Sequence, residues 1–363
     1  MIIISILIFI FILGLLVLVH EWGHFFASRR AGVRVDEFGI GFPPKMLSIQ
    51  RGGTKYSINL FPIGGFVKIH GEDGEGGKEE PNNFMSKSIP ARMSIILAGV
   101  TMNFIAAMAV LSFGFWYGLP QVIDETVDLS RARDAQVSIL QVAPESPAES
   151  AGIKIGDHIL GFAIGGESKE ASTVEEVQEF INTHKGQEFN IAFQRGDEKI
   201  TKTVTPRTVF PEGEGALGIA LAKTAVVSYP VHIAIWNGIK STFVLSGAFL
   251  FAIGGVIAHL FTDGKLVADV AGPIGIGSLV HQFTQLGFPY LIQLTAVLSI
   301  NLAIINALPF PALDGGRFLF LLIEAVKGSP LNQKFEKTAN TAGFALLILL
   351  LILITVKDVM KWF

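Results

Sequence analysis

The chain has 363 residues, of which half are hydrophobic and only 16% are charged. Soluble domains carry about 25% charged residues, so this composition predicts a membrane protein that also contains a soluble portion. The formal net charge of −3 gives no reason to expect nucleic acid as a partner. Because the chain has no cysteine, disulfides and thiolate ligands are excluded, and any metal ion must be held by His, Asp or Glu.

The first apolar run ends in a short metal-binding pattern. Residues 2–19 carry no charge, and the run is followed directly by His20, Glu21, Trp22, Gly23 and His24. On a helix, His20 and His24 project from one face, as two ligands of one zinc ion must, and Glu21 stands where a general base is needed. Ionisable side chains at the end of a membrane helix are costly unless they face a partner or a hydrated cavity. The pattern therefore predicts a zinc site at the mouth of the first span.

Four segments are long and apolar enough to be membrane spans, which predicts a polytopic α-helical membrane protein with four transmembrane helices. They are residues 2–19, 94–117, 290–313 and 342–356. Basic residues gather in the loop between the first two spans and in the loop between the last two. Since basic loops tend to stay in the cytoplasm, we expect both loops inside and both chain ends outside. The zinc pattern then lies on the cytoplasmic side.

A fifth apolar stretch, Phe243 to Phe261, is uncharged for 19 residues. If it crossed the membrane once, the third span would run the opposite way and its end would lie far from the zinc pattern. We therefore expect an amphipathic or re-entrant element, interrupted by Gly247, Gly254, Gly255 and His259.

The residues after the second span predict a soluble α+β domain. Alternating residues at 138–142 predict a strand, the pattern at 174–183 predicts a helix, and two further strands are expected around 190–194 and 199–205. The segment SPAESAGIKIGDHILGF at 146–162 resembles the PDZ domains of bacterial envelope proteases. We divide the chain into a catalytic membrane half (1–120), a PDZ-like domain (121–222), a connecting region (223–289) and a second catalytic membrane half (290–363).

PDZ domains bind the C-terminal carboxylate of a peptide on backbone N–H groups beside a strand edge. The loop Gly215 to Ile219, with Leu217 and Gly218 at its centre, fits that position in a circularly permuted domain. The alternative role is a size filter that excludes substrates with bulky outer domains. The sequence leaves both roles open.

A catalytic zinc needs a third protein ligand, and the best candidate is Asp314. It follows a stretch with Pro309 and Pro311 and precedes Gly315 and Gly316. These residues break regular helix, which a membrane tolerates only beside protein or a wet cavity. Asp314 could instead cap a helix or pair with Arg317.

These motifs together resemble the site-2 protease family of intramembrane zinc metalloproteases, in its bacterial RseP-like branch. The pentad at 20–24 and the Leu-Asp-Gly-Gly at 313–316 carry the resemblance, and further matching segments lie at 38–43, 56–68, 98–104, 272–276 and 299–306. The chain departs from the best-known members in having one PDZ-like domain where they have two. The resemblance implies that Zn²⁺ is the cofactor, that His20, His24 and Asp314 hold it, and that Glu21 is the catalytic base.

Substrate contacts are expected on two segments. Residues 56–69 are strand-like with a bend at Pro62, and could pair edge to edge with an unwound substrate through Ile58, Leu60, Gly64 and Gly65. The resemblance implies this role for a membrane-associated β-hairpin, although an ordinary cytoplasmic hairpin would give the same pattern. The resemblance also implies that Asn306 holds the substrate backbone or polarises its carbonyl group.

The expected function is cleavage of the transmembrane segments of single-span proteins in a bacterial cytoplasmic (inner) membrane. Anti-sigma factors, after a first cut by an upstream site-1 protease, and remnant signal peptides are the expected substrates, and the PDZ-like domain is expected outside the cytoplasm. The alternative is a non-catalytic membrane scaffold that binds protein tails through the PDZ-like domain. Glu21 argues against that alternative, since a scaffold has no use for a general base beside two metal ligands.

Overall fold

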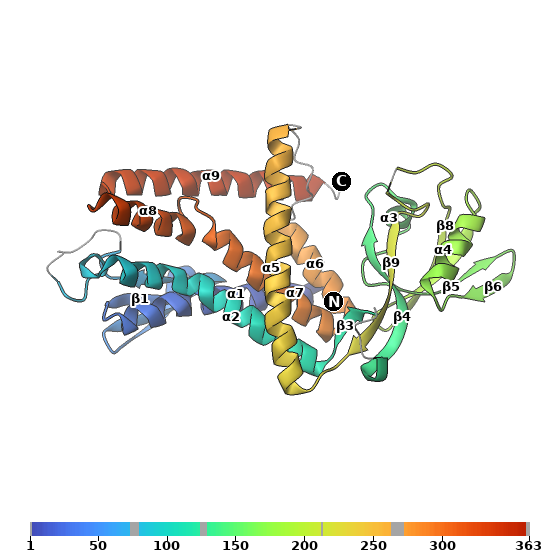
Figure 1. The fold of residues 1–363 in the computed structure, drawn as a ribbon, viewed down its shortest axis with the longest axis horizontal. Helices are drawn as coiled ribbons and strands as arrows, with labels where there is room; N and C mark the ends of the chain where they lie inside the picture. The colour runs from blue at the N-terminus through green and yellow to red at the C-terminus, as the bar shows by residue number, and fades with distance from the viewer. Residues whose placement is uncertain (1, 73–79, 124–128, 212, 263–271, 361–363) are drawn as a thin grey trace. The chain divides into compact units, whose positions relative to one another are not determined.

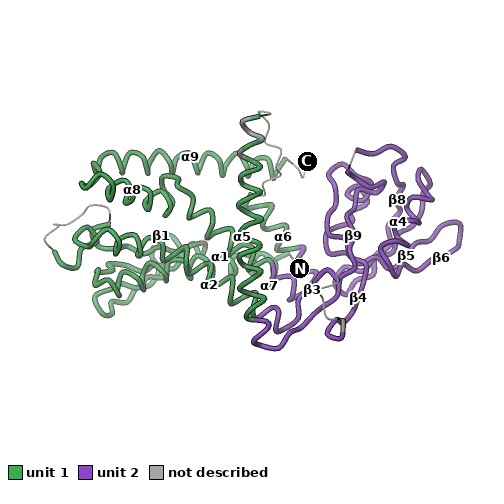
Figure 2. The backbone as a smooth tube through the Cα atoms, viewed as in Figure 1, with its two compact units in different colours: residues 1–112, 235–281, 294–363 green, residues 113–234, 282–293 purple. Residues whose placement is uncertain are grey.

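The computed structural model describes residues 2–72, 80–123, 129–211, 213–262 and 272–360. The chain divides into two compact units (Figure 2). Unit 1 comprises residues 1–112, 235–281 and 294–363, and unit 2 comprises residues 113–234 and 282–293. The four-part division expected from the sequence stays a prediction.

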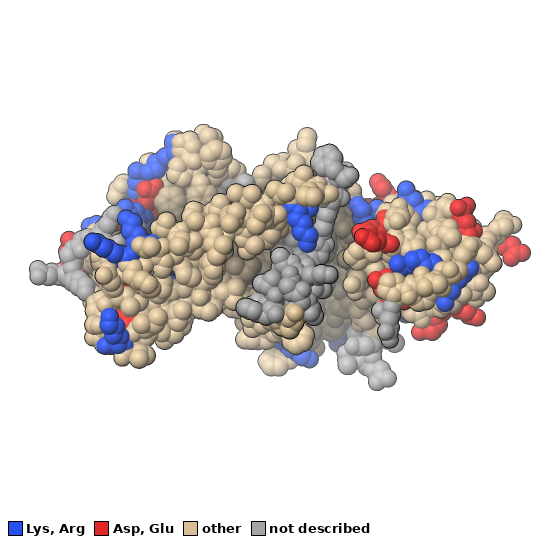
Figure 3. Space-filling model, turned by 90° about the horizontal axis from the view of Figure 1, so that it is seen from above, with Lys and Arg blue, Asp and Glu red and all other residues tan. Residues whose placement is uncertain are grey.

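Unit 1 is built from long apolar helices (Figure 1). They are α1 (Ile2–Arg30), α2 (Ile89–Tyr117), α5 (Val231–Thr262), α6 (Pro273–Leu286), α7 (Phe288–Ala307), α8 (Asp314–Lys327) and α9 (Gln333–Met360). Many of their large apolar side chains are exposed, as expected of surfaces that face lipid. Over these helices the visible surface is almost uncharged and Lys and Arg gather towards one end, whereas unit 2 carries many charges of both signs (Figure 3).

The described part of the chain offers one more candidate span than the four expected, so the number of spans stays a prediction. Five helices of the described part of the chain are long and apolar enough to cross a membrane: α1, α2, α7, α9 and residues Val231–Val256 of α5. The third span ends at Ala307 instead of Leu313 because Pro309 and Pro311 cannot continue a helix. The fourth begins at Gln333, earlier than its apolar run predicted.

The stretch 243–261 is not interrupted, whereas its expected placement as an amphipathic or re-entrant element stays a prediction. It lies within α5, which is continuous through Gly247, Gly254 and Gly255. The helix contains no proline, and a glycine weakens a helix by only about 1 kcal/mol relative to alanine. Two of its side chains, Phe249 and Ile253, pack against a buried cluster from α2 and α7, formed by Ala107, Ile300 and Ile304. This packing and the apolar sequence together outweigh the three glycines.

Strands β1 (Val35–Arg51) and β2 (Thr54–Ile69) form a sheet of their own against α1. They pair antiparallel, with shifts of register where β1 bends at residues 41–46. Residues 37–40 have partners on both sides, at 65–68 and at 55–58, while residues 47–51 pair with 54–58. Among the described pairs, residues 65–67 are bonded on one side only. The strand expected at 56–69 lies within β2, and its open edge is at 65–67.

Unit 2 is an α+β domain. Its strands are β3 (Leu119–Val122), β4 (Ala132–Val142), β5 (His158–Ile164), β6 (Glu167–Glu170), β7 (Phe189–Arg195), β8 (Glu198–Val204) and β9 (Ile219–Val227), and its helices are α3 (Pro147–Ser150) and α4 (Val174–Thr183). The sheet has the order β3-β9-β4-β5-β7-β8, with β6 on β5. The strands and the helix expected at 138–205 are all present. The assignment of this domain as PDZ-like stays a prediction.

Candidate metal centre

Two imidazoles project from the C-terminal half of α1 to one place, as expected from their spacing. His20 and His24 lie one turn apart, and their Nε2 atoms are 3.2 Å from each other. His20 is buried and His24 is nearly so. Both rings therefore point the same nitrogen at one place inside the protein.

Asp314 reaches the same place as the first residue of α8. Its Oδ2 lies 3.1 Å from Nε2 of His20 and 3.2 Å from Nε2 of His24. The alternative roles considered for Asp314 do not describe it, because Leu313 is the N-cap residue, without a side-chain cap, and Arg317 pairs with Glu72. The structure thus brings together, from opposite ends of the chain, the three residues that the sequence singled out.

The three donor atoms fit a zinc ion. They form a nearly equilateral triangle with edges of 3.1–3.2 Å. Tetrahedral zinc with bonds of about 2.0–2.1 Å needs ligand atoms about 3.3–3.4 Å apart. The buried Oδ2 of Asp314 has no hydrogen-bond partner among the described residues. With both Nε2 atoms unprotonated, two nitrogen lone pairs and a carboxylate oxygen at this separation repel one another, and a cation between them removes that repulsion. Within the described chain, these residues form the one cluster of His, Asp and Glu side chains with ligand spacing.

The other nitrogen of each imidazole is held by α2. Nδ1 of His24 lies 2.9 Å from the carbonyl oxygen of Ile95, so it donates there and leaves Nε2 free to bind a metal. Nδ1 of His20 lies 3.3 Å from the side-chain amide of Asn103. The Oδ1 of Asn103 is buried without a partner, and turning the amide would let it accept the Nδ1 proton of His20. Both histidines would then present an Nε2 lone pair.

Glycines let α2 approach the two histidines. A Cβ atom at Gly99 would overlap Nε2 of His24 and would lie 2.7 Å from Cε1 of His20. A Cβ atom at Gly23 would overlap the carbonyl oxygen of Ala98 on α2. Small residues at helix contacts are how membrane helices pack closely. No sequence pattern singled out Gly99, although it lies in a matching segment, four residues before Asn103 on the same helix face.

The turn before Asp314 is fixed by close backbone contacts. A Cβ atom at Gly315 would overlap the carbonyl oxygens of Ala307 and Leu308, so only glycine fits there. Ala312, which has a φ of 76°, donates its N–H to Oδ1 of Asn340 on α9 at 3.1 Å. Asn340 was not expected to support the site, because nothing in the sequence joins α9 to this turn.

Glu21 is close to the three ligands and to the sheet. It interacts electrostatically with His20, His24 and Asp314. A Cβ atom at Gly65 would lie 3.7 Å from Cγ of Glu21. The open edge of β2 therefore passes beside the carboxylate that a hydrolytic site would need as its base.

The remaining expected site residues lie in different settings. Asn306 is half-buried at the end of α7, two residues before the break that leads to Asp314. Ile58 is exposed, but its strand is bonded on both sides, to Ile40 and to Leu47, so its backbone offers no free edge. Leu60 is likewise exposed. In unit 2, Leu217 is buried in the core and its carbonyl oxygen accepts from Ala148.

The helices are long enough to cross a membrane, and two imidazoles and a carboxylate converge beside a glutamate. These features define the protein class as a membrane metallohydrolase. The model of peptidase family M50 matches residues 8–350, and the chain belongs to this family, that of the site-2 proteases. It is 31% identical to zinc metalloprotease RasP of Geobacillus kaustophilus, over 99% of this chain and 98% of that protein. It is 36% identical to a putative zinc metalloprotease of Nostoc, over 98% and 95% of the two chains. It is 29% identical to the regulator of sigma-W protease RasP of Bacillus subtilis, over 99% of each. The protein is therefore a zinc metalloprotease.

Proposed function

We propose that this protein cleaves the transmembrane segments of single-span membrane proteins, with His20, His24 and Asp314 as its zinc ligands. The observation that supports this most directly is the convergence of three donor atoms, 3.1–3.2 Å apart, two from the apolar helix α1 and one from the start of α8. Zinc held there would act as a Lewis acid on the scissile carbonyl group and bring the pKa of a water towards ~7.

Glu21 is the proposed general base. Its carboxylate would accept a proton from the attacking water and later deliver it to the leaving amine. Asn103 and the carbonyl oxygen of Ile95 would hold the two imidazoles in the tautomer that leaves Nε2 free. These contacts all come from α2, so the packing of α1 on α2 sets the geometry of the site.

Residues 65–67 of β2 are the proposed place where the substrate is held. A peptide bond inside a helix is shielded, so a substrate segment must unwind, and its freed backbone groups need partners within the membrane. The open edge of β2 offers such partners. Gly65 has no side chain, which would let an extended substrate lie close to Glu21. Asn306 is proposed to hold the substrate from the other side, at the end of α7.

The active site is proposed to face the cytoplasm of a bacterium, with unit 2 on the outer side of its inner membrane. The basic residues between α1 and α2 and between α7 and α9 support this orientation. It requires α5 to begin and end on the outer side, so α5 would not cross as a single span. Because the chain has no cysteine, single cysteines at the exposed Val231 and Thr262 test this. A membrane-impermeant thiol reagent applied from outside should label both, and labelling at only one would reverse the conclusion.

Anti-sigma factors and remnant signal peptides are the proposed substrates, the former after an upstream site-1 protease has acted. The relative in Bacillus subtilis carries the name regulator of sigma-W protease, which supports the first class. Unit 2 would act either on substrate tails or as a size filter. Residues 224–227 of β9 are already paired with β3 and Lys223 accepts a hydrogen bond from the N–H of Ile123, so on this edge a tail could add only alongside residues 219–222.

The scaffold alternative is disfavoured because a scaffold needs neither Glu21 nor three convergent ligands. The test is to reconstitute the purified protein in lipid with a tagged single-span substrate, with and without a zinc chelator. We expect cleavage within the spanning segment, loss of cleavage with the chelator and recovery when zinc is returned. Cleavage that the chelator leaves unchanged would contradict the proposal.

A further inference from the structure

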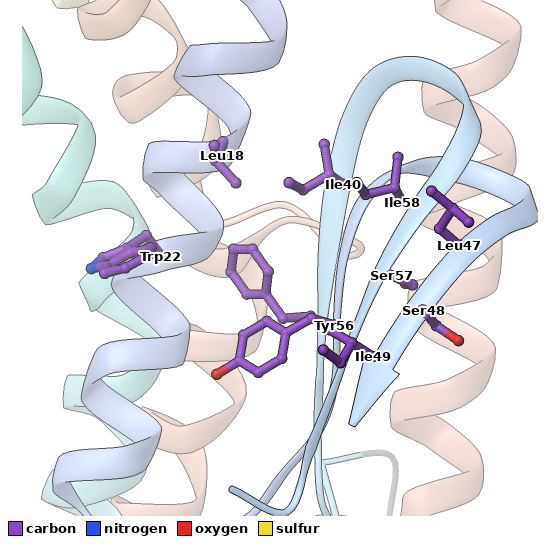
Figure 4. Close-up of a pocket in the computed structure, with 10 residues that line it drawn as sticks. Leu18, Trp22, Ile40, Leu47, Ser48, Ile49, Tyr56, Ser57 and Ile58 are labelled. Atoms are coloured by element: carbon purple, nitrogen blue, oxygen red, sulfur yellow. The ribbon is translucent and has the colours of Figure 1, made fainter. Parts of the chain in front are cut away.

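A cavity of about 450 Å³ lies between α1 and the apolar face of the β1–β2 sheet. Its walls include Leu18 and Trp22 on the helix and Leu47, Ile49 and Tyr56 on the sheet. Figure 4 shows Leu18 on the side of α1 that faces the sheet, across from Ile40. The walls are almost wholly apolar, and neither the zinc ligands nor Glu21 contribute to them.

The sheet side of this cavity changes from apolar to basic along one strand. Successive residues of a strand point to opposite faces, so Leu47, Ile49 and Arg51 share a face. Leu47 and Ile49 are 68% and 66% exposed, so they leave a large apolar surface without a protein partner. Arg51 lies at the hairpin turn, opposite Thr54. Glu37 and Lys45 form an ion pair on the opposite face of the sheet, so these two charged side chains do not line the cavity.

The residues of α1 on this side also change from apolar to basic towards the hairpin turn. At 3.6 residues per turn, Arg29 projects within about 20° of both Leu18 and Trp22. Its Nη1 donates to the carbonyl oxygen of Gly52 at 3.0 Å, which joins the helix to the hairpin turn beside Arg51. A guanidinium group has five N–H donors, so Arg29 keeps others for a ligand. Two exposed arginines thus lie at one end of an apolar cavity.

We propose that this cavity binds one acyl chain of an anionic phospholipid, with the lipid phosphate on Arg29 and Arg51. The length supports a lipid: Leu18 to Arg29 spans about 16 Å of helix, similar to an extended chain of about a dozen carbons. The charge supports an anionic headgroup, because two guanidinium groups prefer a phosphate that no ammonium group neutralises. The site is separate from the peptidase chemistry and does not depend on the proposed substrate.

Trp22 provides a direct probe, because its indole lines the cavity. In a full-length background with Trp116, Trp236 and Trp362 changed to Phe, its emission is recorded in phosphatidylcholine nanodiscs. Phosphatidylglycerol with a brominated acyl chain, or brominated phosphatidylcholine, is then added at rising mole fraction. We expect half-maximal quenching at a mole fraction at least threefold lower for phosphatidylglycerol, and this comparison needs no arginine variant.

In the double variant Arg29→Gln/Arg51→Gln, brominated phosphatidylglycerol and brominated phosphatidylcholine should reach half-maximal quenching at the same mole fraction. The matched control is Arg30→Gln/Lys55→Gln, which removes the same charge from the same helix and the same β1–β2 hairpin but from other faces, and it should keep the preference. Equal midpoints in the parent background would overturn the proposal, as would an equal loss in the control, which would mean diffuse charge attraction. If the cavity instead holds a protein segment, the midpoints will coincide and an added single-span substrate will restore emission.

Discussion

Arg92 and Glu324 form a buried, bidentate ion pair that joins α2 to α8. Nη1 and Nη2 of Arg92 lie 3.2 and 2.5 Å from the two carboxylate oxygens of Glu324, and both side chains are less than a tenth exposed. α8 begins with the ligand Asp314, and α2 carries the groups that orient His20 and His24. The pair therefore fixes the helix of one ligand against the helix that supports the other two.

Replacing Glu324 alone with Leu should destabilise the protein by about 3–5 kcal/mol, because Arg92 is left buried without a partner. The double variant Arg92→Met/Glu324→Leu should recover most of this loss, since well-packed apolar residues can replace a buried ion pair. Thermal unfolding of both variants in the same lipid, with zinc content measured on each, checks this. A double variant no more stable than the single one would mean that the pair does not couple the two helices.

Gly99→Ala should lower zinc affinity at least tenfold, because the added methyl group would overlap the imidazole of His24. The matched control is Gly247→Ala on α5, where a Cβ atom meets nothing within 4 Å. Zinc affinity measured by competition with a chelator should be unchanged in the control. If Gly99→Ala binds zinc like the parent protein, the close packing of α2 on the ligands is not required.

Asp314→Ala should reduce both zinc content and cleavage, because two histidines alone are too weak to hold a catalytic metal. Metal analysis of the purified variant and a cleavage assay test the two effects separately. Full zinc content with full activity would place the third ligand elsewhere in the chain.

Removing residues 126–208 should leave zinc binding intact and alter the choice of substrates. Every proposed catalytic residue lies in unit 1, while this segment belongs to unit 2. We expect comparable cleavage of a substrate with a short outer tail and, if unit 2 is a size filter, new cleavage of one with a folded outer domain. Loss of cleavage on the short-tailed substrate, with zinc still bound, would make unit 2 part of the catalytic machinery.

The sequence predicted the parts of the site that depend on local spacing. His20 and His24 are one helical turn apart, so helix geometry alone brings them together, and the broken stretch around Asp314 marked it as the third member. Arg92 and Glu324 are separated by 232 residues, and no local pattern joins them. The same holds for Asn340 and Ala312. The element expected at 243–261 rested on the direction required of the third span and on glycines taken as breaks, and the structure contradicts only the breaks, because packing and the apolar sequence keep α5 continuous.

The central claim is that Glu21 is the base of a zinc peptidase whose metal is held by other residues. The most direct test is Glu21→Gln, with zinc content and cleavage of a single-span substrate measured on the same preparation. The substitution keeps the size of the side chain and leaves all three ligands in place, so zinc content should match that of the parent protein while cleavage is lost by at least about a hundredfold. Cleavage near the parent rate with zinc bound would contradict the assignment of Glu21.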